Sequence, residues 1–141
     1  MKDKKTRPSI IEAFNAAIQG IIYTFKYERN MKIHYIIAVA VLIISLRFDL
    51  NKFEMMILIL SISLVIISEM FNTAIENTVD LVTDKYHYLA KIAKDVAAGG
   101  VLISALNAVA VGYLIFYDKF TDLKEYIEDK DILEKQKLVE V

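Results

Sequence analysis

The stretch FEMMILILSISLVIISEMFNTAIENTVD, residues 53–80, decides the fold, because an apolar half runs directly into a polar half without Pro or Gly. Beyond Glu54, the apolar half contains no charged residue as far as Ile67. The polar half then places Glu69, Asn72, Glu76 and Asp80 at the end of the apolar stretch. We therefore expect one long helix over about 53–82, with its first part in lipid and its last part emerging from it.

Two further apolar blocks flank this stretch, IHYIIAVAVLIISLRF at 33–48 and VAAGGVLISALNAVAVGYLIFY at 96–117. A spanning helix needs about 20 largely apolar residues, with a range of roughly 17–25. The later block meets that length, and the earlier one reaches it if Arg47 extends to the interface. A soluble bundle is the alternative, but its surface helices would show a polar stripe. The sequence predicts an all-α membrane protein with spans at about 33–50, 53–82 and 96–117.

The segment before the first predicted span is amphipathic. Ile10, Phe14, Ala17 and Ile21 recur at helical spacing, which predicts a surface helix over about 8–30. Such a helix lies in the membrane interface, and a packing helix without chemistry is the alternative. Residues 1–117 then form a membrane domain. The charged tail at 118–141 is either a solvated helix or a disordered segment.

Composition excludes several classes of function. The 141 residues are 56% hydrophobic and include no Cys, so a disulfide framework, a thiolate zinc site and a cysteine nucleophile are excluded. The basic N-terminus is not followed by an apolar region with a cleavage site, so we expect no removable signal peptide. No strongly basic domain accompanies it, so we expect no nucleic-acid partner.

Positive charge predicts the orientation. Residues 1–32 carry seven Lys or Arg against three acids, and the loop at 83–95 adds three lysines. Cytoplasmic segments are enriched in Lys and Arg, so we expect the N-terminus and this loop in the cytoplasm. The tail, with five Lys and eight acids, then lies on the far side.

Glu69, Asn72, Glu76 and Asp80, here called the acidic row, share one face of the expected helix. At 1.5 Å per residue the row is about 16 Å long. Acidic groups in line repel each other unless a cation lies between them, and Mg²⁺ prefers oxygen ligands with substrate phosphates. A carboxylate at the membrane edge is also a candidate general base. Interhelical hydrogen bonds in an oligomer, or the ion path of a non-enzymatic channel or transporter subunit, are the alternatives.

A second candidate segment follows, DKYHYLAKIAKD at 84–95. Lys94 lies where the chain re-enters the membrane, suited to neutralising charge on a phosphate. The alternative is a lysine that extends to the interface beside a helix-capping Asp95. The sequence contains neither GxxxxGK[ST] nor GxGxxG, so helix side chains would have to form any nucleotide site. These residues indicate a cation-handling membrane protein without naming its substrate.

The motifs EMFNTAIENTVD at 69–80 and YHYLAKIAKDVAAGGVL at 86–102 resemble the bacterial integral-membrane diacylglycerol kinase/undecaprenol kinase family. The resemblance covers about residues 8–117, including the ERN element at 28–30. It implies a homotrimer of three-span subunits, each with an N-terminal surface helix. It also implies ATP-dependent phosphorylation of a lipid alcohol at the cytoplasmic face of the bacterial cell membrane.

The same resemblance implies roles for individual residues. Glu69 would be the general base that takes the proton of the lipid hydroxyl, and Glu28 and Glu76 would bind Mg²⁺. The residues that would position the phosphates and the nucleotide are Asn72, Asp80, Tyr86, His87, Lys94 and Asp95.

Three positions bear on which lipid is phosphorylated. Members that act on diacylglycerol commonly carry an Arg and a Tyr in the surface helix, where this chain has Ser9 and Ala16. His34 replaces an acidic residue of that branch, within an ERNMKIH run similar to that of Gram-positive members. The resemblance therefore favours undecaprenol over diacylglycerol as the substrate. His34 and His87 have a simpler alternative reading as interfacial polar residues.

Overall fold

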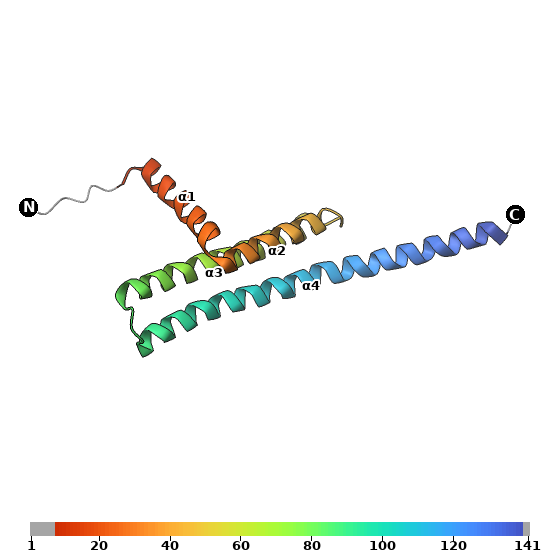
Figure 1. The fold of residues 1–141 in the computed structure, drawn as a ribbon. Helices are drawn as coiled ribbons and strands as arrows, with labels where there is room; N and C mark the ends of the chain where they lie inside the picture. Colours follow the sequence, from red (N-terminus) through yellow and green to blue (C-terminus); the bar gives the residue numbers. More distant parts are fainter. Residues whose placement is uncertain (1–7, 140–141) are drawn as a thin grey trace, which may run out of the picture.

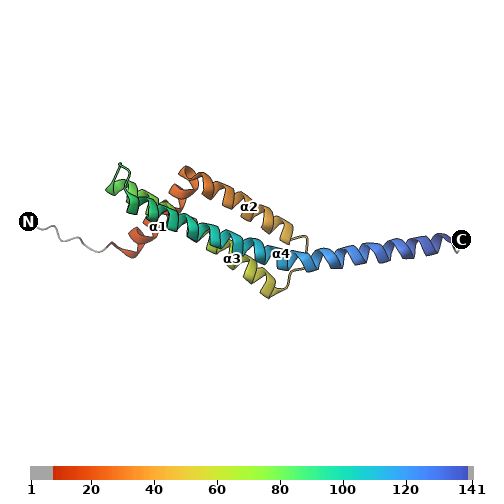
Figure 2. The ribbon, with the colours of Figure 1, turned by 90° about the horizontal axis from the view of Figure 1, so that it is seen from below.

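The computed structural model describes residues 8–139, except the side chains of 133, 134 and 137–139. This part of the chain forms four helices, α1 (Ile10–Tyr27), α2 (Arg29–Ser45), α3 (Lys52–Val82) and α4 (Tyr88–Val139). The helices α2, α3 and the first part of α4 lie side by side, while α1 diverges from them (Figures 1 and 2). The all-α prediction is confirmed. Residues 1–7, which carry four of the seven basic residues of the N-terminal segment, lie outside the described residues.

Local capping explains where two helices begin. The Ser9 side chain accepts a hydrogen bond from the Glu12 amide at 3.2 Å, and the Glu12 carboxylate accepts one from the Ser9 amide at 2.7 Å. This capping box satisfies amides that the first helical turn leaves free. The bond from the Ser9 backbone is the main reason that the pKa of Glu12 is lowered. Asn51 and Glu54 form the same arrangement at the start of α3.

The break between α1 and α2 falls at Glu28, whose backbone is extended (φ −90°, ψ 123°). The surface helix predicted over about 8–30 therefore ends at Tyr27, and the next helix begins at Arg29. The acidic side chain stands at the corner between the two helices. This corner lies beside α3 (Figure 1).

The predicted spans agree with the observed helices to different degrees. The helix predicted over 53–82 is α3 to within one residue. The block predicted over 33–50 is α2, which begins and ends earlier, because the chain turns after Ser45. By length and composition, α3 and residues 88–132 of α4 are suited to crossing a membrane, whereas α2, with 17 residues, is at the lower limit. The three-span arrangement stays a prediction.

The fourth helix is longer than the sequence suggested. It begins at Tyr88 rather than near 96 and continues without a break to Val139, so most of the charged tail is helical. Lys119 ties it to the α2–α3 turn, donating to the Asp49 carbonyl at 3.0 Å and lying 3.5 Å from the Glu54 carboxylate. Phe48 packs edge-on against Phe116 and Phe120 at the same level. Beyond this contact α4 projects past the other helices (Figure 1).

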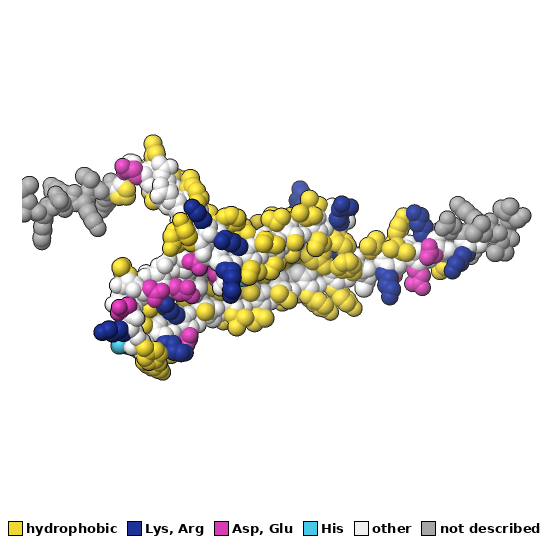
Figure 3. Space-filling model, viewed as in Figure 1, with side chains coloured by type: hydrophobic (Ala, Val, Ile, Leu, Met, Phe, Trp, Pro, Cys, Tyr) yellow, Lys and Arg dark blue, Asp and Glu magenta, His cyan; other side chains and the backbone are white. Residues whose placement is uncertain are grey.

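Among the side chains that the structure describes, few apolar ones are buried within a single chain. They are Met31, Ala38, Leu58, Val65 and Ile115. Large apolar residues instead cover the outside of the helices, and Figure 3 shows this apolar surface with charged groups gathered at its two ends. Exposed apolar surface of this extent needs lipid or another protein surface to cover it.

Candidate active site

Three buried polar residues lie together about two-thirds of the way along α3. Glu69 is only 2% exposed, and Asn72 and Thr73 are buried one turn further on. One oxygen of each side chain is buried without a hydrogen-bond partner among the described residues: Glu69 Oε2, Asn72 Oδ1 and Thr73 Oγ1. Buried polar atoms normally find partners, and leaving one unpaired costs about 1–3 kcal/mol. These three oxygens are free to bind a ligand, a water molecule or a group from another subunit.

Asn72 links this buried group to the next turn of the helix. Its amide Nδ2 donates to the Glu76 carboxylate Oε1 at 3.0 Å. The bond holds the side chain with its free Oδ1 turned from Glu76. The half-buried Glu76 therefore continues the row that Glu69 begins.

Glu28 approaches the same place from another element. It is half-buried at the α1–α2 corner, and its side chain makes no capping hydrogen bond to the described helix start. Glu28, Glu76 and His34 all lie close enough to Glu69 to interact with it electrostatically. Glu28 and Glu76, which the sequence also singled out, thus both lie within electrostatic range of Glu69.

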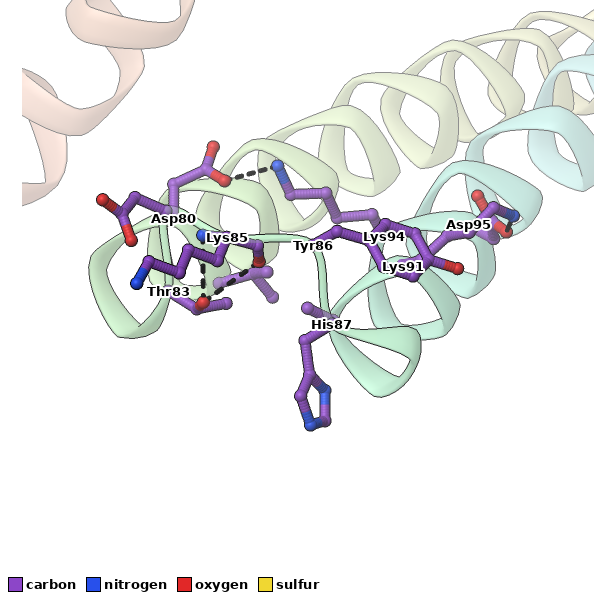
Figure 4. A pocket seen from close by; sticks show the side chains of 11 residues that line it. Asp80, Thr83, Lys85, Tyr86, His87, Lys91, Lys94 and Asp95 are labelled. Carbon is purple, nitrogen blue, oxygen red and sulfur yellow. Dashed lines mark hydrogen bonds and ion pairs between the residues drawn. The ribbon is translucent and has the colours of Figure 1, made fainter.

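The far end of the acidic row has a different character. Asp80, at the exposed end of α3, forms an ion pair with Lys94 of α4 at 2.5 Å. Lys91 and Asp95 pair at the same distance, one turn apart on α4. Both pairs line a cavity of about 650 Å³ between the end of α3, the loop and the start of α4 (Figure 4). We call it the loop cavity; its volume falls within the range of small-molecule sites.

Tyr86 and His87 also line the loop cavity. His87 is engaged locally, since its Nδ1 accepts a hydrogen bond from the Leu89 amide at 3.2 Å at the start of α4. Its ring points away from Asp80 and Lys94 (Figure 4). Of the two predicted nucleotide-side residues, His87 is therefore the less suited to touch a ligand directly.

Sequence reasoning passed over Lys91 and Thr83. Lys91 lies four residues before Asp95, and opposite charges at this spacing on a helix form ion pairs. The Lys91–Asp95 pair could therefore have been predicted from the sequence. Thr83 Oγ1 accepts a hydrogen bond from the Lys85 amide at 3.2 Å, which shapes the loop around the cavity. That bond depends on the loop conformation, and no spacing rule predicts it.

The residues around Glu69 fit Mg²⁺ in their donor chemistry. They offer carboxylate and amide oxygens, and two of those oxygens, on Glu69 and Asn72, are buried without a hydrogen-bond partner in the described part of the chain. Over residues 8–139, however, no three acidic or histidine side chains are arranged to hold a metal by themselves. Mg²⁺ often takes only one or two carboxylates and completes its shell with water and substrate phosphates. An ion held here would need such additional ligands.

Together, the fold and the site define a class of protein: an all-helical protein suited to lipid surroundings, with an acidic site at the polar end of its longest apolar helices. Comparison with known proteins identifies the family. Residues 15–116 match the family described as Prokaryotic diacylglycerol kinase. The chain belongs to this family of membrane proteins, and it is a lipid kinase that uses a nucleotide to phosphorylate a lipid.

Individual relatives carry two different names. The chain is 46% identical over 108 residues to the undecaprenol kinase of Bacillus subtilis, covering 77% of this chain and 88% of the relative. It is 44% identical over 106 residues to the diacylglycerol kinase of Synechocystis, covering 74% of this chain and 61% of the relative. The diacylglycerol kinase of Escherichia coli K12 is 29% identical over 111 residues, covering 79% and 91%. The matches leave most of the C-terminal extension of α4 unaccounted for.

Proposed function

We propose that this chain phosphorylates undecaprenol to undecaprenyl phosphate, with MgATP as the phosphoryl donor. The observation that carries the proposal is the buried Glu69, whose Oε2 has no hydrogen-bond partner in the described structure, at the point where the apolar half of α3 ends. A lipid hydroxyl arriving from the membrane reaches this level of the helix first. The exposed pairs of the loop cavity lie further along α3, where a water-soluble nucleotide arrives.

In the proposed reaction Glu69 takes the proton of the lipid hydroxyl. The hydroxyl oxygen then forms a bond to the γ-phosphorus, the bond from that phosphorus to the β–γ bridging oxygen breaks, and ADP leaves. Such a transfer depends mainly on positioning and charge stabilisation. Glu28 and Glu76 would hold Mg²⁺, which neutralises charge on the phosphates when bound.

The remaining residues of the site serve the nucleotide in this proposal. Asn72 already orients Glu76 through its amide. Lys94 would exchange Asp80 for a phosphate, because an exposed ion pair is weak enough to open. Asp95, Tyr86 and His87 complete the wall of the loop cavity, with His87 shaping the start of α4.

Two observations support undecaprenol as the substrate. The relative with 46% identity is named for it, and Ser9, which stands where diacylglycerol-acting members commonly have an Arg, is engaged in capping α1. Diacylglycerol is the second candidate, favoured by the 44% identity to the Synechocystis protein. A non-enzymatic channel or transporter role has no such support, since the matched family is a kinase family.

The deciding experiment uses the purified full chain in mixed micelles, with ATP labelled at the γ-phosphate and either lipid. We expect the label mainly in undecaprenyl phosphate, and Glu69→Gln to slow its appearance by at least about 100-fold. A kcat/KM for diacylglycerol equal to or above that for undecaprenol would overturn the proposed substrate.

We also propose a homotrimer with three spans per subunit and a cytoplasmic N-terminus in the bacterial cell membrane. The apolar exterior and the incomplete metal shell of the described chain support further subunits. Native mass spectrometry tests the trimer. The chain has no cysteine, so single cysteines in Gln19→Cys and Lys130→Cys report the orientation through a membrane-impermeant thiol reagent. In intact cells only the second is expected to react.

A further inference from the structure

A second cavity, of about 300 Å³, lies between α2, α3 and α4. We call it the apolar cavity. Its lining is almost wholly aliphatic and aromatic, with Ala38, Leu58, Val65 and Phe116 among its residues. The cavity exists because small residues line it on the α4 side, namely Ala105, Ala108 and Gly112. The cavity therefore suits a hydrocarbon chain.

One polar residue connects this cavity with the candidate active site. His34 of α2 lines the apolar cavity, is half-buried, and lies within electrostatic range of Glu69. No residue of the acidic row, Glu69 included, lines this cavity, but Val65, one turn of α3 before Glu69, does. His34 therefore borders the apolar space at the end that approaches the carboxylate, where a lipid alcohol would change from hydrocarbon to hydroxyl.

We propose that His34 positions the lipid hydroxyl against Glu69, and that the apolar cavity holds the hydrocarbon directly attached to that hydroxyl. This inference rests on the proposed function. A hydroxyl oxygen carries one proton and two lone pairs. When the proton points to Glu69 and one lone pair to the γ-phosphorus, the other can accept a hydrogen bond from an imidazole N–H. His34 thus acts as a positioning residue.

The arrangement also bears on lipid selectivity. In a polyprenol the hydrocarbon begins at the carbon that bears the hydroxyl, whereas in diacylglycerol two polar ester groups stand between the hydroxyl and the chains. The cavity is apolar from the turn after His34, at Ile37 and Ala38. Apart from His34 and the hydroxyl-bearing Ser61 and Tyr113, its walls offer no side-chain hydrogen-bond donor, so burying two ester carbonyls there is unfavourable. The geometry therefore favours an alcohol of the polyprenol type.

The lipid is a better occupant of the apolar cavity than a helix from a second copy. The cavity is bounded by three helices of one chain, and at Val65 it comes within one helical turn of the buried Glu69. A hydrocarbon chain is thin enough to enter such a space, whereas a helix with side chains is about 10–12 Å wide.

The test compares His34→Leu with His34→Gln, which keeps an N–H donor. We expect His34→Leu to lower kcat/KM for undecaprenol about tenfold, as for loss of one hydrogen bond at the reacting group, with the KM for MgATP unchanged. His34→Gln should recover most of this loss, and the exposed neighbour Lys32→Gln should match the wild type. Wild-type lipid kinetics in His34→Leu, or a parallel rise in its KM for MgATP, would overturn the inference.

A second variant tests the cavity itself. Ala105→Phe fills it, and Leu106→Phe places the same bulk on the exposed face of α4 as a control. We expect only Ala105→Phe to lower kcat/KM for undecaprenol, with a smaller loss for a ten-carbon prenol. Equal losses in both variants would count against lipid in the cavity. A failure of the proposed function would instead appear in the wild-type chain, as absence of label in any polyprenol.

A photoreactive benzophenone side chain at Val109 identifies the occupant directly. A lipid adduct on irradiation in undecaprenol-containing micelles supports the inference, and a covalent pair of protein chains in place of that adduct overturns it.

Discussion

The two ends of the acidic row differ in how their charges are satisfied. At Glu69 and Asn72 the polar atoms are buried, and one oxygen on each lacks a hydrogen-bond partner within the described chain. At Asp80 and Lys94 the charges are exposed and already paired with each other. The same helix therefore has buried oxygens without hydrogen-bond partners at Glu69 and Asn72. At Asp80 it has an exposed ion pair that a ligand can displace.

The two ends of the acidic row therefore differ in the free energy that ligand binding changes. A buried polar group without a partner is unfavourable, so the fold maintains the Glu69 region at an energetic cost that a ligand would repay. An exposed ion pair contributes at most about 1 kcal/mol, so it can open for a phosphate at little cost. Variants at the buried end should change the transfer step itself, and variants at the exposed end should change nucleotide binding.

The largest effect is expected at the buried end. Glu69→Gln keeps the shape of the side chain but removes the general base, which should lower kcat by roughly 100- to 10,000-fold. The Kd for MgATP, measured by calorimetry, should stay within about twofold of the wild type, because the nucleotide is expected at the exposed end of the row. Retention of near wild-type kcat would show that Glu69 does not take the proton.

Glu76, midway along the row, should show a mixed effect. Glu76→Gln retains an acceptor for the Asn72 amide and loses the charge for the metal. We expect kcat/KM to fall about 100-fold, as for loss of one group that stabilises charge in the transition state. The concentration of Mg²⁺ giving half-maximal rate should rise in parallel. An unchanged Mg²⁺ requirement would remove Glu76 from the metal site.

The sequence predicted some parts of this arrangement better than others. The long apolar run fixed α3 almost to the residue, because helix periodicity and the absence of Pro and Gly act locally. For the tail past Tyr117 the sequence left a solvated helix and a disordered segment as alternatives, and the structure has the helix. The change from apolar to charged residues alters the surroundings of a helix and not its propensity. Lys, Glu and Leu are all good helix formers.

The candidate site likewise has parts that the sequence predicts and parts that it does not. The shared face of Glu69, Asn72 and Glu76 follows from spacing along one helix. The approach of Glu28 depends on a helix break that has neither Gly nor Pro to mark it. The Asp80–Lys94 pair joins residues 14 positions apart, and it forms only because the loop turns α4 back along α3. Such contacts depend on tertiary structure.

A moderate effect is expected at the exposed end. Lys94→Met removes the cation that would meet a phosphate, and we expect the KM for MgATP to rise about tenfold, as for one charge-assisted hydrogen bond. The KM for the lipid should not change. Because this end is solvated, added salt should raise the KM for MgATP of the wild type more than that of Lys94→Met. Lys52→Gln, at the other end of α3, is the control for loss of a surface charge.

The smallest effect is expected where α4 projects beyond the other helices. Removing 123–141 leaves Lys119 and its contacts to Asp49 and Glu54 in place, so kcat/KM for both substrates should change less than twofold. Lys119→Met, by contrast, should lower the free energy of unfolding by about 1 kcal/mol, while leaving the rate constants of the folded enzyme unchanged. Thermal unfolding in micelles, compared with the rate constants, distinguishes a loss of stability from a loss of activity. A large loss of kcat on truncation would mean that the extension acts on the acidic row over the length of α4, and the contrast drawn between its two ends would then be incomplete.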